Sequence, residues 1–232
     1  MLAQTIACMS VTPLDIAFAR HALLHFFPRE LINHILVLVN YSPRVVTRSD
    51  QELAVIAPFT EHNDIQKVYL LSSAIPHEPT RLPEKLQLLD TMHIRSVKFT
   101  FVSHDQGWGG QVEHKGSYRE TWSWFEAAII RNGEPKGELG LSELQFNGKS
   151  RWDLQRNRHA FGDRQEHVVT WFKSTNHDEA LTSVLLTRGS GPGIGFVDAL
   201  REGDQVAIIA RARYPGWANR VYSAEIDIDI SV

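Results

Sequence analysis

Two short segments of the sequence surround a tryptophan with glycines and hydrogen-bonding side chains. One is SHDQGWGG, residues 103–110, and the other is YPGWANR, residues 214–220. A flat apolar ring beside a few fixed hydrogen-bond partners suits the binding of a sugar ring or another small polar-aromatic ligand. The two segments therefore supply the ligand-binding candidates, which are Asp105, Gln106, Trp108, Trp217 and Asn219.

The same tryptophans have a second interpretation, in which each ring closes one end of a hydrophobic core. The glycines on either side of Trp108 let its backbone approach another surface closely, and this fits both interpretations. Both also place Trp108 and Trp217 in loops. If the two loops lie at one end of the fold, a shared ligand site is the better interpretation.

A third chemistry that the sequence allows is acid–base catalysis. His104 and Asp105 are neighbours in the first segment, and Glu126 lies in the stretch TWSWFE. An aromatic-lined pocket that positions a substrate beside such groups can catalyse a cyclisation or an isomerisation without a cofactor. The candidate catalytic residues are His104, Asp105 and Glu126, and the sequence leaves open whether the protein is an enzyme or a binding module.

Trp122 and Trp124 are two residues apart, so on a strand both rings point to one face. We expect both rings to pack in the core and to bring Glu126 inward with them. A buried carboxylate needs a partner or takes a raised pKa. The arginines of RWDLQRNR, residues 151–158, can supply that partner or can form a solvated edge.

The sequence lacks the motifs of a metal site, a phosphate-binding loop and a covalent nucleophile. The eleven histidines show neither His-x-His nor Glu-x-x-His spacing, so we expect no metal ion. GSGPGIG, residues 189–195, lacks the long helix and the Lys-Ser/Thr pair of a phosphate-binding loop, and we expect a mobile loop that can cover a ligand site. With no Gly-x-Ser-x-Gly motif and a single cysteine far from the candidate loops, we expect neither a cofactor nor a covalent nucleophile.

The composition of the chain limits its expected cellular location and its expected classes of binding partner. The chain has 232 residues with 24 basic and 27 acidic side chains, and no dense basic run that would bind nucleic acid. Cys8 is the only cysteine, so no internal disulfide is expected. No apolar stretch reaches the roughly 18 residues of a membrane helix, and charged residues interrupt the start of the chain. We therefore expect an intracellular, cytoplasmic protein with no membrane or nucleic-acid partner.

From residue 94 onward apolar and polar residues alternate with a period of two, the spacing of half-buried strands. SAEIDIDI near the C-terminus is the clearest case, because aliphatic residues lie on one side and carboxylates on the other. The other segments of this kind are SVKFTFVS, WSWFEAAII, EHVVTWF and DQVAIIARA. No long helix alternates with them, so we predict a mainly β fold, an antiparallel β-sandwich of the jelly-roll type.

The N-terminal region is predicted to be helical. Residues 14–27 carry apolar side chains at helical spacing, and residues 26–43 form a second helix with Pro28 in its first turn. The apolar stripe of this second helix consists of Leu31, Ile32, Ile35, Leu36 and Val39. Such a stripe must pack on the sandwich or on a partner. The predicted organisation is a helical region over residues 1–75, a Pro-rich linker over 76–93 and the sandwich over 94–232.

The C-terminal region resembles a family of largely uncharacterised fungal proteins. In that family an F-box-like helix precedes a sandwich marked by Asp-Gln-Gly-Trp, Trp-Thr-Trp-Phe-Glu and Pro-Gly-Trp-x-Asn. The residues that carry the resemblance are SVKFTFVSHDQGWGG, GSYRETWSWFEAAII, RWDLQRNRHA and FVDALREGDQVAIIARARYPGWANRVYSAEIDI. The last segment is also similar, more distantly, to the sugar-recognising domain of glycoprotein-binding F-box proteins, which implies a galactose-binding-like fold and a glycan ligand.

The N-terminal region carries a second resemblance. FPRELINHIL, residues 27–36, looks like the opening of an F-box, in which a Pro-x-Glu-Leu helix start leads into an Ile-Leu pair that docks on an adaptor subunit. This resemblance implies an F-box adaptor protein as partner and a role as an F-box-type substrate receptor.

Overall fold

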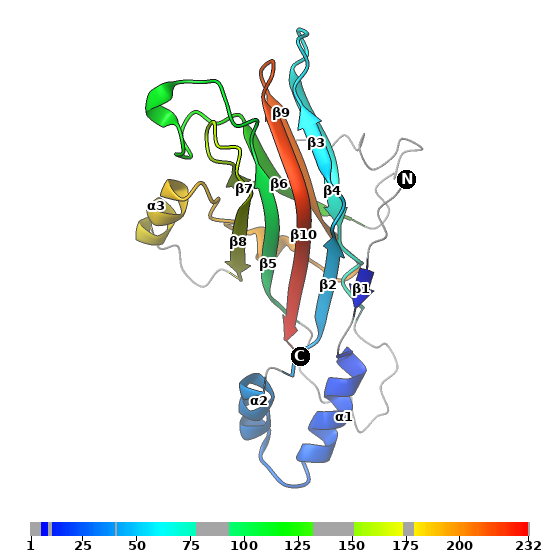
Figure 1. The fold of residues 1–232 in the computed structure, drawn as a ribbon. Coiled ribbons are helices and arrows are strands. Elements are labelled where there is room, and N and C mark those ends of the chain that lie inside the picture. The colour runs from blue at the N-terminus through cyan, green and yellow to red at the C-terminus, as the bar shows by residue number, and fades with distance from the viewer. Residues whose placement is uncertain are drawn as a thin grey trace.

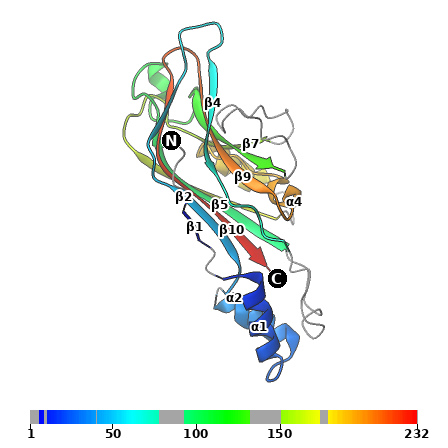
Figure 2. The ribbon, with the colours of Figure 1, turned by 90° about the vertical axis from the view of Figure 1, so that its right-hand side faces the viewer.

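The computed structural model describes residues 6–8, 11–39, 41–77, 93–131, 151–173 and 179–231. These residues form two antiparallel β-sheets in two layers, with a pair of helices at the N-terminal end (Figures 1 and 2). The predicted antiparallel sandwich preceded by short helices is therefore confirmed. None of the described helices is both long and apolar enough to cross a bilayer.

Sheet A has six strands, and the long C-terminal strand lies inside it. The order is β1-β2-β10-β5-β8, and β3 pairs with the first residues of β10. The strands are β1 (Ile6–Cys8), β2 (Arg44–Ser49), β3 (Leu53–Ile56), β5 (His93–His104), β8 (Gln165–Phe172) and β10 (Ala218–Ser231). Because β10 pairs with β2 and β3 along one edge and with β5 along the other, it joins the two halves of the chain.

Sheet B has four strands in the order β4-β9-β6-β7, all of them antiparallel. The strands are β4 (Asp64–Leu71), β6 (Ser123–Ile130), β7 (Arg151–Arg156) and β9 (Gln205–Arg213). The main core lies between the two sheets, as the period of two predicts. Its largest fully buried side chains include Phe99, Phe101, Ile226 and Ile228 from sheet A and Phe125 and Ile208 from sheet B.

The sandwich starts earlier in the chain than the sequence predicts. The division into a helical region over residues 1–75 and a sandwich over residues 94–232 is wrong, because β2 and β3 pair with β10 and β4 pairs with β9. The physical reason is that these strands are short or only partly buried, so their alternation is weak beside the Leu- and Ile-rich composition. Most of the predicted linker lies outside the described residues.

The predicted N-terminal helices are present. Helix α1 (Pro13–Leu23) starts with a capping box, in which Thr12 accepts a hydrogen bond from the Asp15 backbone and the Asp15 carboxylate accepts one from the Thr12 backbone. Helix α2 (Arg29–Leu38) starts directly after Pro28. Beyond α2 the chain enters strand β2, so the F-box-like stretch is followed by the sandwich.

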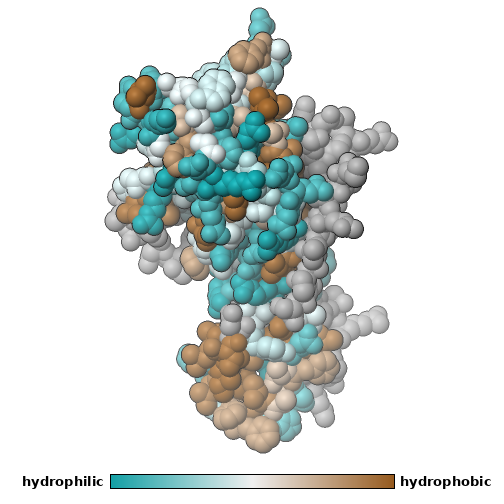
Figure 3. Space-filling model, viewed as in Figure 1, coloured by the Kyte–Doolittle hydropathy of each residue, from teal (hydrophilic) through white to brown (hydrophobic). Residues whose placement is uncertain are grey.

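The two helices share a small core of their own. Ile16 of α1 packs on Ile32 and Leu36 of α2, and this cluster is separate from the core between the sheets. The apolar stripe of α2 is therefore only partly covered, because Leu31 and Val39 remain exposed. Figure 3 shows apolar side chains gathered over this end of the molecule.

The glycine-rich segment at residues 189–195 lies between helices α3 (Glu179–Thr187) and α4 (Phe196–Ala199). The Gly191 amide donates to the Leu154 carbonyl at 3.0 Å, and the Gly191 carbonyl accepts from the Trp171 indole at 2.9 Å. A Cβ at Gly193 would lie 2.1 Å from the same indole, so only glycine fits there. The segment packs over Trp171 and pairs with the edge of β7 through Ser190 and Gln155.

Candidate functional site

Three loops meet at one end of the sandwich, which we call the tip; it lies at the top of Figure 1. They are residues 57–63 between β3 and β4, residues 105–122 between β5 and β6, and residues 214–217 between β9 and β10, and a fourth loop, residues 157–164 between β7 and β8, packs against them. The Ala57 amide donates to the Trp217 carbonyl at 2.9 Å, and the Ala218 amide donates to Oε1 of Gln106 at 3.1 Å. The predicted adjacency of the two tryptophan-bearing loops is therefore confirmed.

Two aromatic rings stand exposed at the tip. Trp108 is 65% exposed and Phe59 is 82% exposed. Both rings approach Gly216, where an added Cβ would lie 3.4 Å from Cζ of Phe59 and 3.6 Å from Cη2 of Trp108. Gly216 has a φ of +85°, so the turn requires glycine and leaves space between the rings. We call Phe59, Trp108 and Gly216 the aromatic platform.

Asp105 is fully buried and binds backbone amides. Its carboxylate accepts hydrogen bonds from the amides of Gly107 at 2.7 Å, Ala160 at 2.5 Å and Phe161 at 2.9 Å. Burial raises the pKa of Asp105, and these bonds to the backbone oppose that rise. Asp105 therefore shapes the loop that carries Trp108, and the structure keeps its carboxylate away from solvent.

Gln106 links the two tryptophan-bearing loops. Its amide oxygen accepts from Ala218 in one loop, and its amide nitrogen donates to the Trp108 carbonyl at 2.7 Å in the other. Both polar ends of the side chain are thus engaged within the protein. Gln106 fixes the position of Trp108 beside the β9–β10 turn.

The remaining two predicted ligand residues lie deeper. Trp217 is half-buried, and its ring meets that of His159 edge-on at 5.2 Å. Asn219 is fully buried, with its amide nitrogen donating to the Trp124 carbonyl at 2.8 Å and its amide oxygen accepting from Asn157 at 3.0 Å. The prediction that Asn219 contacts a ligand is wrong, because its position on β10 turns it into the interior.

A buried polar network centred on Asn157 closes the sandwich beneath the tip. The amide oxygen of Asn157 accepts from the Ser103 hydroxyl at 2.7 Å, and its amide nitrogen donates to the Ser123 hydroxyl at 3.1 Å and to Asn219. Ser103 and Asn219 belong to sheet A and Ser123 to sheet B, so the network joins both layers. The sequence does not reveal Asn157 as a core residue, because it stands between two arginines.

The three candidate catalytic residues do not converge. His104 faces outward from sheet A, and its Nε2 lies 2.8 Å from the Tyr222 hydroxyl. Glu126 lies on the outer face of sheet B, since its neighbour Phe125 points into the core. Asp105 lies between them in the interior, engaged by backbone amides. The grouping of His104, Asp105 and Glu126 in one catalytic pocket is therefore wrong.

Glu126 takes part in an ion cluster on the outer face of sheet B. Its carboxylate accepts from Nη1 of Arg211 at 3.0 Å, from Nη1 of Arg151 at 3.1 Å and from the Trp124 indole at 3.0 Å. The prediction that Trp122 and Trp124 pack in the core is wrong, because both rings are only half-buried and β6 directs Phe125 inward instead. Of the two alternatives for the arginines of residues 151–158, Arg151 acts as the partner of Glu126, and Arg211 was not predicted.

In the part of the chain that the structure describes, no three His, Cys, Asp or Glu side chains are grouped as a metal site requires. No protein-family model and no curated protein matches this sequence. The function is therefore inferred from the geometry of the tip. Of the predicted ligand residues, Trp108 is the one whose side chain is both exposed and positioned by the others.

Proposed function

We propose that the protein is a ligand-binding β-sandwich module that recognises a glycan at its tip. The observation that carries this proposal is the pair of exposed rings, Trp108 and Phe59, that approach the same glycine. The apolar face of a sugar ring stacks on an exposed aromatic ring, and two neighbouring rings offer a longer contact surface. An exposed aromatic pair of this kind is otherwise an unfavourable feature of a protein surface.

The loops that carry the platform are held before any ligand arrives. Asp105 binds three backbone amides, and Gln106 connects Trp108 to the β9–β10 turn. A ligand that stacks on a pre-ordered surface loses less conformational entropy on binding. Asp105 and Gln106 are thus positioning residues for Trp108, while Trp108 and Phe59 are the contact residues.

The alternative of a cofactor-free cyclase or isomerase has less support. Such an enzyme needs an acid and a base that converge on one substrate atom. At the tip, Asp105 is enclosed by backbone amides, and Glu126 is paired with two arginines on another face. The exposed aromatic surface of the tip favours binding over catalysis.

The test is a titration of the protein with a panel of mono- and disaccharides, followed by tryptophan fluorescence and by NMR. For any sugar that binds, Trp108→Ala should weaken binding by about 1–3 kcal/mol, roughly 5- to 150-fold. Phe172→Ala is the matched control, because Phe172 is 66% exposed on β8, away from the tip loops, and this change should leave binding unaltered. Equal losses in both variants, or no response to any sugar, would contradict the proposal.

We also propose that the α1–α2 hairpin docks on an F-box adaptor protein. Its support is the F-box-like stretch in α2 together with exposed apolar side chains such as Phe26, Val37 and Leu38. Apolar surface of this extent marks an interaction site in water-exposed proteins. The glycan-binding tip and the docking helices then occupy opposite ends of the molecule (Figure 1).

This docking is tested by the binding of a purified F-box adaptor to the full chain. Leu38→Glu should abolish the interaction, because it places a charge in the apolar surface and Leu38 is not part of the helix core. Phe59→Ala at the tip is the control and should bind the adaptor as the unmodified protein does. A monomer that fails to bind the adaptor would leave the helices without this role.

A further inference from the structure

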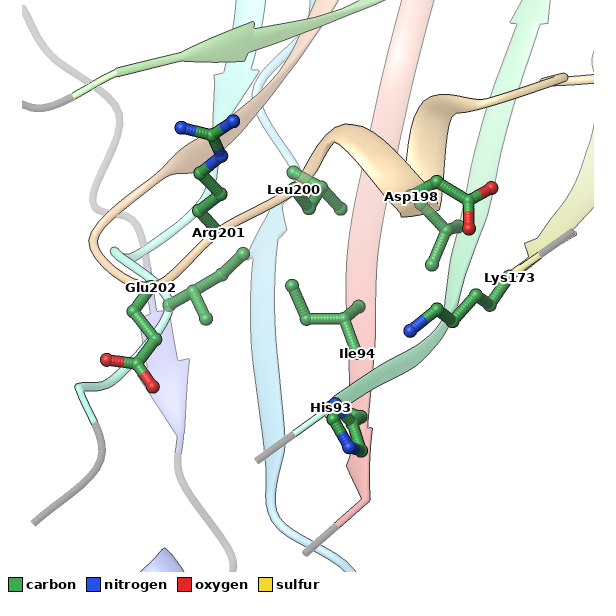
Figure 4. A pocket seen from close by; sticks show the side chains of 9 residues that line it. His93, Ile94, Lys173, Asp198, Leu200, Arg201 and Glu202 are labelled. Carbon is green, nitrogen blue, oxygen red and sulfur yellow. The ribbon is translucent and has the colours of Figure 1, made fainter. Parts of the chain in front are cut away.

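A cavity of about 210 Å³ lies at the end of the sandwich opposite to the tip, which we call the base (Figure 4). Strand β5 begins beside this cavity at His93 and ends at His104, directly before the tip loop. A strand of this length spans roughly 35 Å, so the base cavity and the aromatic platform are separate sites. Glycan binding at the tip does not involve the base cavity.

The floor of the cavity is aliphatic. It is formed by Ile75 after β4, Ile94 on β5, and Val197 and Leu200 in and after α4. Ile75, Val197 and Leu200 are buried and belong to the main core, and Ile94 packs against it. An aliphatic group that entered the cavity would therefore extend the existing hydrophobic core.

The rim of the cavity carries charges of both signs, but they differ in their partners. The Glu202 carboxylate lies 3.5 Å from Nδ1 of His77, and Asp198 also has an interaction within the protein. Within the described residues, the side-chain nitrogens of Lys173 and Arg201 take part in no hydrogen bond or ion pair. Lys173 and Arg201 are thus the rim cations whose charge can meet a ligand, which favours an anionic ligand.

Lys173 is the better placed of the two cations. It follows the last residue of β8, and its side chain extends across the cavity toward Ile94 (Figure 4). The side chain of Arg201 extends away from the floor in the same view. A carboxylate attached to an aliphatic chain on the floor would therefore meet the Lys173 ammonium first.

We propose that the base cavity binds an aliphatic carboxylate, with the chain on the floor and the carboxylate against Lys173. At about 30 Å³ for each water-sized group, the cavity holds roughly seven non-hydrogen atoms. The aliphatic chain of hexanoate fits this volume, and so does the side chain of a carboxyl-terminal leucine, with the carboxylate at the rim in both cases. Both sources share the same chemistry, an aliphatic group that ends in a carboxylate.

The experiment is an NMR titration of the full chain with sodium hexanoate, hexylammonium chloride and hexanol as matched probes. Hexanoate should shift the amide signals of Ile94, Val197 and Leu200, whereas the cation and the alcohol should not. Lys173→Met should weaken hexanoate binding roughly tenfold. Lys98→Met is the matched control, because Lys98 is an exposed lysine on β5 outside the cavity, and it should bind hexanoate normally.

Two further measurements are needed. One identifies whether the carboxylate comes from a peptide or from a free acid, and the other shows that the base cavity binds independently of the tip. Tighter binding of the peptide Ala-Ala-Leu than of hexanoate, lost in the C-terminal amide, would identify a peptide carboxyl terminus; equal binding would identify a small free acid. Trp108→Ala should leave hexanoate binding intact. Equal binding of hexanoate and hexylammonium, absence of shifts at the floor residues, or equal effects of Lys173→Met and Lys98→Met would overturn the proposal.

Discussion

The tip and the base close the same sandwich by different means. Beneath the tip, amide and hydroxyl groups centred on Asn157 join the two sheets. Toward the base, aromatic rings link sheet A to sheet B through α4. Trp171 of sheet A meets Phe196 of α4 edge-on at 4.8 Å, and Phe196 meets Trp152 of sheet B edge-on at 4.9 Å. The sandwich is thus closed by a polar network beneath the tip and by a chain of aromatic rings toward the base.

This difference explains why two tryptophans of one protein have different environments. Trp171 is buried, and its indole N–H binds the Gly191 carbonyl. Trp108 is exposed because the polar network and Asp105 already complete the interior below it. An aromatic ring that closure does not need is available for a ligand, whereas the base can offer a ligand only aliphatic and charged groups.

The largest expected effect is at the base. Trp171→Ala should lower the free energy of unfolding by about 3–5 kcal/mol, because it leaves a cavity beside Phe99 and Phe196 and removes the bond to Gly191. Urea unfolding measures this loss. Trp171→Phe should retain much of the packing and lose less. A loss below about 1 kcal/mol for the alanine variant would show that aromatic packing does not close the base.

The second largest effect is a pH dependence of the free energy of unfolding, and it comes from His167 in the interior below the tip. Burial and, to a smaller extent, the charge of Arg158 together lower the pKa of His167 to about 4. The unfolded chain binds this proton with a pKa near 6.5, so stability is complete above that pH and is lost as the pH falls toward 4. The full loss is about 3 kcal/mol.

Unfolding curves between pH 4 and pH 7 measure this contribution. His167→Leu should remove the part of the pH dependence that His167 causes. The raised pKa of Asp105 acts with the opposite sign, since it favours folding as the pH falls, but it is common to both proteins and cancels in the comparison. Parallel curves for the two proteins would mean that His167 is not a buried neutral side chain.

A smaller effect is expected from the carboxylate that shapes the tip. Asp105→Ala should lower the free energy of unfolding by about 1–3 kcal/mol, because three backbone amides lose their acceptor. Asp163→Ala is the control, because Asp163 is an exposed acid two residues after Phe161, and it should change stability by less than about 0.5 kcal/mol. Thermal unfolding distinguishes them, and similar values for both would show that Asp105 does not support the loop.

The sequence pattern predicts most of the strands of the sandwich. For some strands it does not predict which face turns toward the core. β5 and β10 have one apolar and one more polar face, so their inward residues follow from alternation. β6 is apolar on both faces, so alternation alone does not decide whether Trp124 or Phe125 points inward. Pairing with β9 decides this, and such long-range contacts are not encoded in a local pattern.

The candidate site was predictable only in part for a similar reason. Glycines around Trp108 and Trp217 correctly indicate turns, and the turns do lie together. Asn219 and Asp105 look like exposed polar residues of those turns, but partners from distant segments make them part of the interior. Phe59 was not predicted because it lies between two strands whose alternation is weak.

The smallest stability effect is expected where the ligand is proposed to bind. Trp108→Ala should change the free energy of unfolding by less than about 0.5 kcal/mol, because its ring is largely exposed and closes no part of the core. Trp217→Ala should cost more, since that ring is half-buried against His159. Thermal unfolding of these two variants beside Trp171→Ala therefore gives a rising series. A loss for Trp108→Ala as large as that for Trp171→Ala would make Trp108 a plug that closes the tip, and the contrast between the two ends of the sandwich would disappear.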